Sequence, residues 1–169
     1  KLAVHHSSAS EEHWTPTDIV GAVLEVLGAV DLDPCSNSRT APNVPAGQHY
    51  IQEDDGLERE WSGRVYMNPP YGRQIGLWAE KLVAELESGR LTEALALVPA
   101  RTDTQWWKTL EDFPVCFIEG RLTFVNNEDP APFPSAVFYL GPNVERFFDV
   151  FSAYGSIWRK MVPGFDFGE

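Results

Sequence analysis

The tetrapeptide Asn68-Pro69-Pro70-Tyr71, which follows the apolar residues 65–67, contains residue types that can bind one particular chemical group. Each proline fixes its torsion angle φ at about −65° and lacks an N–H, so the backbone is stiff and its carbonyls stay available. The Asn68 side-chain oxygen and the Pro69 carbonyl can then accept hydrogen bonds from one amino group, and Tyr71 offers a flat face for stacking. This set suits the exocyclic NH2 of a planar heterocycle or a flat amide, whereas the simplest alternative is a strand followed by a proline-rich turn.

Acidic residues in two further segments could serve the same site. Asp33-Pro34-Cys35 stands at the carboxyl end of an expected strand, where an acid could hold the positive amino or sulfonium end of a ligand. The segment contains no Gly-x-Gly, so a phosphate cradle is not expected. Asp54 and Asp55 precede the next strand, and one of them could accept a hydrogen bond from a ligand's amino group. The alternatives are a polar turn after a strand and an Asp-Gly turn.

Arginines and aromatic residues form a third group in the second half of the chain. Arg101 follows an apolar strand and could bind a phosphate or form a local ion pair. Arg121, Phe124, Phe133 and Ser135 flank a polar loop. An arginine with aromatic side chains beside such a loop could hold an extruded base or a nucleic-acid backbone. The alternative is a hairpin with its own aromatic core.

Hydrophobic periodicity and turn residues indicate the elements that must position these groups. A helix is expected to open at Thr15-Pro16, with Thr15 as its cap and Pro16 in the first helical position. Further helices are expected at 75–88, 104–110 and 144–151. Strands are expected at 30–33, 50–51, 64–67, 94–98, 115–118, 121–125 and 136–140, with a turn at 119–120.

This alternation of strands and helices predicts an α/β fold with a mainly parallel sheet and an antiparallel edge. Ligands of such sheets bind beyond the carboxyl ends of the strands. Asp33, Asp55, Asn68 and Pro99 all fall at or near strand ends. This shared position is the main internal support for a functional site.

Length and composition limit the class of protein. The 169 residues fit one domain, placed at 14–169, and 43% apolar residues can form a substantial core. No apolar run is long enough to span a bilayer, and the amino-terminal stretch lacks the apolar centre of a secretory signal. Two cysteines suggest no disulfide framework, so a cytoplasmic location is expected.

Residues 1–13 are expected to form a flexible lead-in. They contain His5, His6 and His13 among serine and glutamate residues. A solvated tail is favoured over a metal site in such a polar stretch, and no metal is expected.

The formal charge of −12 is unfavourable for binding nucleic acid, because neutralisation of phosphates dominates such affinity. A few cations on one face can still bind DNA while acids elsewhere repel it. The charge therefore predicts weak, salt-sensitive binding, or help from a partner subunit such as the second copy of a homodimer.

Taken together, these segments resemble the small phage-type DNA N6-adenine methyltransferases, the Dam family of phages and prophages. The resemblance runs from Trp14 to about Phe138, and the ordered set is more specific than the tetrapeptide alone. The matching segments are Trp14-Thr15-Pro16, Leu32-Asp33-Pro34-Cys35, Asp54-Asp55-Gly56-Leu57 with Trp61, Asn68-Pro69-Pro70-Tyr71-Gly72, Leu97-Val98-Pro99-Ala100-Arg101 with Thr104 and Trp106, Gly120-Arg121-Leu122 with Phe124, and Ala131-Pro132-Phe133-Pro134-Ser135.

The resemblance implies a three-layer, Rossmann-like methyltransferase fold and a site-specific enzyme that methylates the N6 amine of adenine in DNA with S-adenosylmethionine. It implies that Thr15 and Pro16 contact the methionine part of the cofactor. It also implies that Asp55, in preference to Asp54, lies where cofactor and base meet. The residues expected to bind the cofactor are Thr15, Pro16, Asp33, Pro34, Cys35, Asp54, Asp55 and Asn68. The expected catalytic residues are Asn68, Pro69, Pro70 and Tyr71. The residues expected to bind substrate are Tyr71, Arg101, Arg121, Phe124, Phe133 and Ser135.

Departures from the family pattern leave other functions open. The glycine-rich cofactor loop of larger methyltransferases is absent, and residues 34–68 are few for a helix, a strand and a second helix. A non-catalytic module that binds DNA or a protein on a methyltransferase fold is therefore an alternative. A methyltransferase for glutamine side chains in proteins is another, because Asn-Pro-Pro-Tyr also suits a flat amide. RNA could also replace DNA as the substrate.

Overall fold

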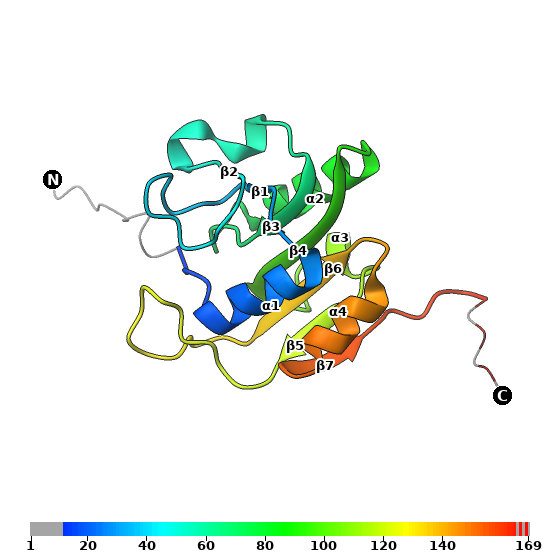
Figure 1. Ribbon diagram of the computed structural model, residues 1–169. Helices are drawn as coiled ribbons and strands as arrows, with labels where there is room; N and C mark the ends of the chain where they lie inside the picture. Colours follow the sequence, from blue (N-terminus) through cyan, green and yellow to red (C-terminus); the bar gives the residue numbers. More distant parts are fainter. Residues whose placement is uncertain (1–11, 165, 167, 169) are drawn as a thin grey trace, which may run out of the picture.

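A mixed β-sheet organises the chain, of which the computed structural model describes residues 12–164, 166 and 168 (Figure 1). Within these residues the sheet has seven strands in the order β2-β1-β3-β4-β6-β5-β7, so the predicted α/β class is confirmed. The strands are β1 (Leu32–Asp33), β2 (Gln48–His49), β3 (Gly63–Met67), β4 (Leu91–Pro99), β5 (Val115–Ile118), β6 (Ser135–Leu140) and β7 (Gly155–Trp158). The helices are α1 (Thr17–Leu27), α2 (Ile75–Glu87), α3 (Trp107–Leu110) and α4 (Val144–Phe151), with short 3-10 turns η2 (Gln52–Asp54) and η3 (Gly56–Glu58).

The sheet divides into a parallel half and an antiparallel half. β2, β1, β3 and β4 run parallel to one another. β6 is antiparallel to both β4 and β5, and β5 is antiparallel to β7. The antiparallel part is therefore half of the sheet, not only an edge as the sequence predicts. Because β6 runs opposite to β4, Ser135 at its start lies beside Pro99 at the end of β4.

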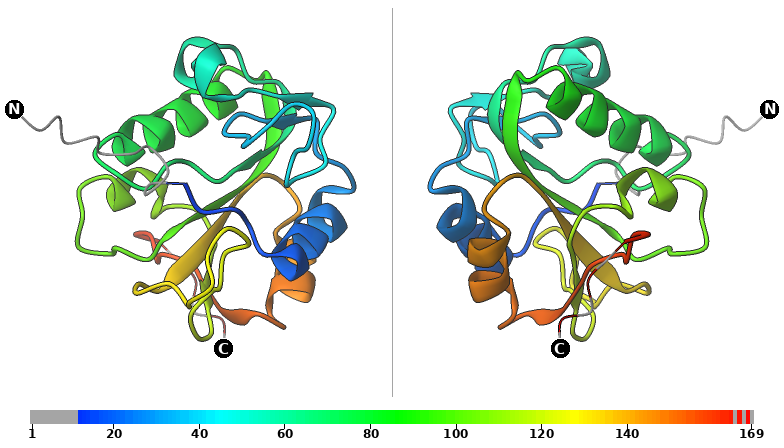
Figure 2. Two further views of the ribbon diagram at one scale, coloured as in Figure 1. Left: turned by 90° about the vertical axis from the view of Figure 1, so that its left-hand side faces the viewer. Right: turned by 90° about the vertical axis from the view of Figure 1, so that its right-hand side faces the viewer.

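The helices lie against both sides of the sheet. α1 packs on α4, and α2 packs on α3, and Figure 2 shows the two pairs on opposite sides of the strands. The central strand β4 is buried from Glu93 to Pro99, which explains the continuous apolar run at 94–98. α2, with 13 residues, is the longest helix in the described residues, and none of the helices there is long and apolar enough to cross a bilayer.

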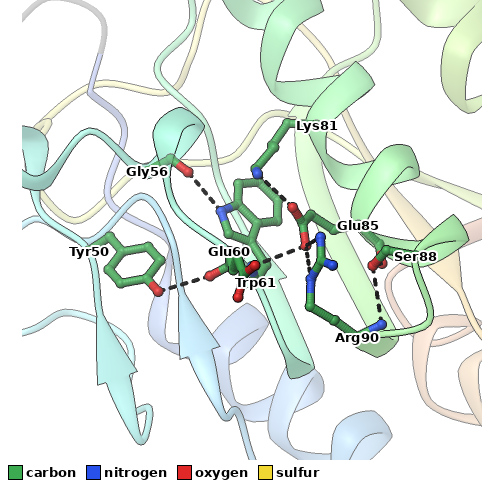
Figure 3. A network of polar contacts seen from close by, with 8 residues as sticks. All are labelled: Tyr50, Gly56, Glu60, Trp61, Lys81, Glu85, Ser88 and Arg90. Atoms are coloured by element: carbon green, nitrogen blue, oxygen red, sulfur yellow. Dashed lines mark hydrogen bonds and ion pairs between the residues drawn. The ribbon is translucent and has the colours of Figure 1, made fainter.

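A buried carboxylate ties α2 to the segment before β3 (Figure 3). Glu85 accepts a hydrogen bond from the Trp61 backbone N–H at 3.2 Å and forms ion pairs with Lys81 at 2.6 Å and Arg90 at 3.1 Å. Burial acts to raise the pKa of Glu85, but these three partners together outweigh it and hold the pKa below its ordinary value. The Trp61 indole N–H in turn donates to the Gly56 carbonyl at 2.8 Å, so the network holds the turn at Gly56 against α2.

The start of α1 differs from the prediction. The helix begins at Thr17, and Pro16 takes the N-cap position in place of the first helical one. The Thr15 hydroxyl, which the sequence predicts as the cap, is buried and lies 2.6 Å from the Tyr66 hydroxyl. Short polar side chains can bond alternative partners, and here the buried hydroxyl of β3 takes the place of a helix N–H.

The predicted hairpin of 115–118 and 121–125 is also wrong. Residues 121–125 form an irregular loop, and β5 pairs with β6 and β7 instead. Phe124 is buried, and the Val125 N–H donates to the Trp14 carbonyl at 2.9 Å. The apolar residues of this segment therefore pack on the amino-terminal segment and do not form a strand. Smaller differences are that the strand predicted at 50–51 lies at Gln48–His49, and that the helix predicted from 104 begins at Trp107.

Candidate active site

A cavity of about 340 Å³ lies beside the carboxyl ends of β1 and β3. This is the edge of a parallel sheet at which ligands usually bind. Many of the residues that the sequence analysis selected line it, and they are Thr15, Asp33, Pro34, Cys35, Asp55, Asn68, Pro69 and Pro70.

Asp33, the last residue of β1, is a buried acid in the cavity wall. The residue is 4% exposed, and its carboxyl accepts a hydrogen bond from the Cys35 backbone N–H at 3.0 Å. Burial raises the pKa of Asp33 to about 7, and the bond from Cys35 only partly opposes this. Burial and the charge of Asp33 also raise the pKa of the Cys35 thiol. A cation bound beside Asp33 would favour its charged form, so the site suits a positively charged ligand group.

Asn68, which follows β3, has its amide group fixed in one orientation. Its Nδ2 donates to the His13 carbonyl and, at 3.1 Å, to the Thr15 hydroxyl oxygen. The His13 carbonyl can only accept, so the NH2 group must face it. This leaves Asn68 Oδ1 buried and without a partner among the described residues. The Tyr66 hydroxyl, 2.6 Å from that of Thr15, completes the support, and burial raises its pKa.

Unpaired polar atoms gather at this cavity. Four buried side-chain nitrogen or oxygen atoms in the described part of the chain lack a hydrogen-bond partner, and three belong to residues that line the cavity. They are the indole nitrogens of Trp14 and Trp78 and Asn68 Oδ1. Buried polar groups are normally paired, so such exceptions require an explanation. A bound ligand with polar groups would supply the partners.

Tyr71, Phe124 and Phe133 gather around the His13 ring beside the cavity, and we refer to these four residues as the aromatic cluster. Phe124 and Phe133 lie edge-on to Tyr71, with ring centroids at 6.1 and 5.6 Å. The His13 ring stacks on Tyr71 at 4.5 Å with an interplanar angle of 19°. Because His13 and Asn68 also line the cavity, the aromatic cluster and the cavity are adjacent. The structure thus brings Tyr71 together with Phe124 and Phe133, which the sequence places in a different group of candidates.

A family model described as DNA N-6-adenine-methyltransferase (Dam) matches residues 4–135. The chain belongs to this family. The match covers all the residues that line the cavity and the whole aromatic cluster, whereas α4, β7 and most of β6 lie outside it. No curated protein sequence matches the chain significantly. Membership confirms the resemblance inferred from the sequence and assigns the chain to the DNA adenine methyltransferases.

In this Dam family member the two neighbouring aspartates have different surroundings. Asp54 accepts a hydrogen bond from the Ile51 N–H at 2.8 Å and pairs with Arg39, and these partners lower its pKa. Asp55 lines the cavity with φ of 52°, in the left-handed region. The structure therefore brings Asp55 to the cavity and engages Asp54 elsewhere. Pro16, buried at the start of α1, is not among the described residues that line the cavity.

The remaining predicted substrate residues lie around the aromatic cluster or away from it. The exposed guanidinium of Arg101 lies over the Phe133 ring, 5.9 Å from its centroid. Arg121 is exposed on the loop that leads to Phe124. Ser135 is buried at the start of β6, and its hydroxyl has no hydrogen-bond partner within the described residues.

Several residues that line the cavity are not among the site residues that the sequence predicts. Those not selected as site residues are Glu12, His13, Trp14, Ser36, Asn37, Asn43, Val44, Ile51, Gln52, Gly56, Leu57, Tyr66, Gln74 and Trp78. The polar loop after β1 carries one usable signal, because loops that follow parallel strands line such sites. His13 carries none, since it stands in the polar stretch predicted to be a lead-in.

No group of three or more His, Cys, Asp or Glu side chains in the described part of the chain is arranged to hold a metal ion. His5 and His6 lie outside the described residues, as does most of the predicted flexible lead-in at 1–13. His13, which belongs to the same stretch, packs in the aromatic cluster.

Proposed function

We propose that this protein transfers the methyl group of S-adenosylmethionine to the exocyclic N6 amine of adenine at specific sites in DNA. Membership of the Dam family supports the reaction, and helices on both sides of the sheet support a three-layer, Rossmann-like methyltransferase fold. One observation carries the assignment of the site. Asn68 Oδ1 is buried, has no partner among the described residues and belongs to a residue at the cavity wall just after β3.

The cavity fits S-adenosylmethionine in size and chemistry. Its volume of about 340 Å³ lies within the range of roughly 300–1,000 Å³ typical of small-ligand sites. Asp33 would hold a positive end of the cofactor, and Asp55 would lie where cofactor and base meet. The unpaired indole N–H groups of Trp14 and Trp78 would donate to its oxygen or nitrogen atoms. When bound, S-adenosylmethionine supplies an electrophilic methyl carbon, whose bond to sulfur breaks as its bond to nitrogen forms.

The chain supplies two acceptors for the adenine amine. Asn68 Oδ1 and the Pro69 carbonyl would accept the two amine hydrogens, which draws the nitrogen toward tetrahedral geometry and localises its lone pair. The amine then loses one proton to solvent, because neither an amide nor a peptide carbonyl is a base at neutral pH. Alignment of the reactants supplies most of the acceleration, an effect that reaches about 7–11 kcal/mol in well-oriented systems.

Tyr71 would supply the face on which the target base stacks. An adenine in a duplex must first leave the stack, at a cost of roughly a few kcal/mol. Stacking on an aromatic side chain contributes about 1–3 kcal/mol and would offset part of that cost. Phe124 and Phe133, edge-on to Tyr71, would close the sides of the base site.

Exposed arginines would bind the DNA backbone. Arg101 lies at the rim of the aromatic cluster, and Arg121 lies on the loop before Phe124. The formal charge of −12 opposes binding, so we expect affinity that is weak and falls steeply with salt. A homodimer that extends the DNA groove and a cytoplasmic location stay predictions from the sequence.

Replacement of Asn68 tests the proposal. We expect Asn68→Ala to lower the transfer of tritiated methyl groups to adenine-containing DNA by at least about 100-fold, as loss of one preorganised hydrogen-bonding group does in other active sites. Asn127→Ala, at an exposed asparagine, is the matched control and should retain activity. Near-normal turnover by Asn68→Ala, with its fold intact by circular dichroism, would refute the assignment.

The same label separates the alternative functions. Digestion with a nuclease releases it if DNA is methylated, digestion with a protease releases it if a glutamine side chain is methylated, and RNA is tested in parallel. Calorimetric titration with S-adenosylmethionine separates an enzyme from a non-catalytic module. An absence of binding even with DNA present would favour the module.

A further inference from the structure

The His13 ring occupies the stacking face of Tyr71 in the aromatic cluster. It lies nearly parallel to Tyr71, with ring centroids 4.5 Å apart, and meets Phe124 at 4.9 Å and Phe133 at 5.4 Å in edge-on contacts. A flat, nitrogen-containing ring is thus held by one parallel ring and two edge-on rings. A nucleobase bound by stacking would require the same surroundings.

The backbone of the same segment contacts Asn68, the proposed acceptor residue. The His13 carbonyl accepts a hydrogen bond from Asn68 Nδ2, which also donates to the Thr15 hydroxyl oxygen. Residues 12–15 all line the cavity. One short segment therefore contacts both the stacking residue and the acceptor residue that the methyl transfer would need.

Three hydrogen bonds fasten this segment to the neighbouring loop, and the two that the Asn126 side chain makes are exposed to solvent. The Trp14 N–H donates to Asn126 Oδ1 at 2.9 Å, and Asn126 Nδ2 donates to the Glu12 carbonyl at 3.0 Å. The Val125 N–H donates to the Trp14 carbonyl at 2.9 Å. Water can replace the partners in exposed hydrogen bonds at a small net cost in free energy. A segment held in this way therefore opens far more easily than a core element.

We propose that residues 12–14 form an internal plug, in which the His13 ring takes the place of the target adenine until DNA binds. The proposal rests on the proposed function, because it takes Tyr71 as the stacking residue for the base. Two rings cannot share one face of Tyr71, so adenine and His13 exclude each other there. The apparent affinity for adenine is then reduced by the fraction of molecules in which the plug is open.

Substitution of His13 tests this competition. We expect His13→Ala to bind a fluorescein-labelled oligodeoxyadenosine more tightly than the unsubstituted chain, by about two-fold to ten-fold, the range that one stacked aromatic pair contributes. His13→Phe keeps a stacking ring and should bind no more tightly than the unsubstituted chain. Phe148→Ala, which removes an exposed aromatic ring from α4, is the control and should leave the affinity unchanged. Fluorescence anisotropy with S-adenosylhomocysteine present measures binding without turnover.

Proton NMR gives a readout that is independent of affinity. The ring current of Tyr71 shifts the imidazole resonances of His13, which are identified as those missing from the spectrum of His13→Ala. Saturation with oligodeoxyadenosine should move them to the positions of an exposed histidine. Oligodeoxythymidine at the same concentration should leave them in place.

Two kinds of failure are distinguishable. Equal or weaker binding by His13→Ala, or imidazole resonances that keep their shift in the complex, would overturn the plug and make His13 a wall of the base site. Failure of the unsubstituted chain to bind or methylate adenine-containing DNA would overturn the proposed function, and the plug with it.

Discussion

Asp33 makes the stability of the protein depend on pH in the opposite direction from most aspartates. Burial raises the pKa of its carboxyl from the ordinary value of 3.8 to about 7 in the folded state. Between these two values the folded protein holds a proton that the unfolded chain has already released. The free energy of unfolding therefore falls as pH rises through this window and stays low above it.

We predict that Asp33→Asn is more stable than the unsubstituted chain at pH 8. The separation between 3.8 and about 7 corresponds to on the order of 4 kcal/mol at pH 8, and to about 1.5 kcal/mol at pH 5. The asparagine cannot ionise, and its side-chain oxygen can still accept the Cys35 N–H. Its buried NH2 group carries a cost of its own, but that cost does not depend on pH. The advantage of the variant should thus grow by about 2–3 kcal/mol between pH 5 and pH 8.

Urea unfolding followed by tryptophan fluorescence, without cofactor, measures this difference at pH 5, 6.5 and 8. Asp31→Asn is the matched control, because hydrogen bonds and the charge of Arg64 lower the pKa of Asp31. The stability that Asp31 contributes is lost only at acid pH, below 3.8. Asp31→Asn should therefore destabilise the protein by a constant amount from pH 5 to pH 8. If Asp33→Asn and the unsubstituted chain showed the same pH dependence, the reasoning about the buried carboxyl would be wrong.

Two further substitutions test the structure around the site. Glu85→Gln should lower the free energy of unfolding by about 1–3 kcal/mol, because it leaves two cations without a charged partner. The exposed Glu87→Gln on the same helix is its control and should stay within about 0.5 kcal/mol. Tyr66→Phe should cost about 1 kcal/mol by removing the 2.6 Å bond to Thr15. Urea unfolding at pH 7 measures all three, and a Glu85→Gln effect no larger than that of Glu87→Gln, or a neutral Tyr66→Phe, would contradict the assigned bonds.

Elements whose burial leaves a clear local pattern are predictable from the sequence. The helix expected at 75–88 is α2 (Ile75–Glu87), and α4 (Val144–Phe151) has the expected bounds. The strand expected at 94–98 lies inside β4 (Leu91–Pro99). Burial of one face leaves a helical periodicity in α2 and α4, and burial of both faces leaves a continuous apolar run in β4, so local patterns indicate all three.

Elements that depend on distant partners are poorly predicted. The apolar residues of 121–125 suggest a strand, but Phe124 packs on Tyr71 and His13, which lie far away in the sequence. Thr15 has the sequence signature of a helix cap, yet its hydroxyl bonds Tyr66. Local patterns cannot show which of two available partners a polar or aromatic side chain meets once the chain folds.

The same limit applies to the candidate site. Asp33 and Asn68 are identifiable because they end or follow strands, and the structure sets both in the wall of one cavity. His13 precedes the first helix in a polar stretch, so only the folded arrangement reveals that its ring packs on Tyr71.

The cavity and the aromatic cluster have His13 in common, and Asn68 in the cavity wall donates a hydrogen bond to the His13 carbonyl. This adjacency constrains the binding thermodynamics. A ligand that shifts residues 12–14 when it binds in the cavity changes the affinity of the aromatic cluster for its own ligand. Thermodynamic linkage requires the second ligand to change the affinity of the first by the same free energy. Methyl donor and nucleic acid would then lack independent dissociation constants. Each titration curve would move with the concentration of the second ligand, and a single fixed affinity for either one would not describe the protein.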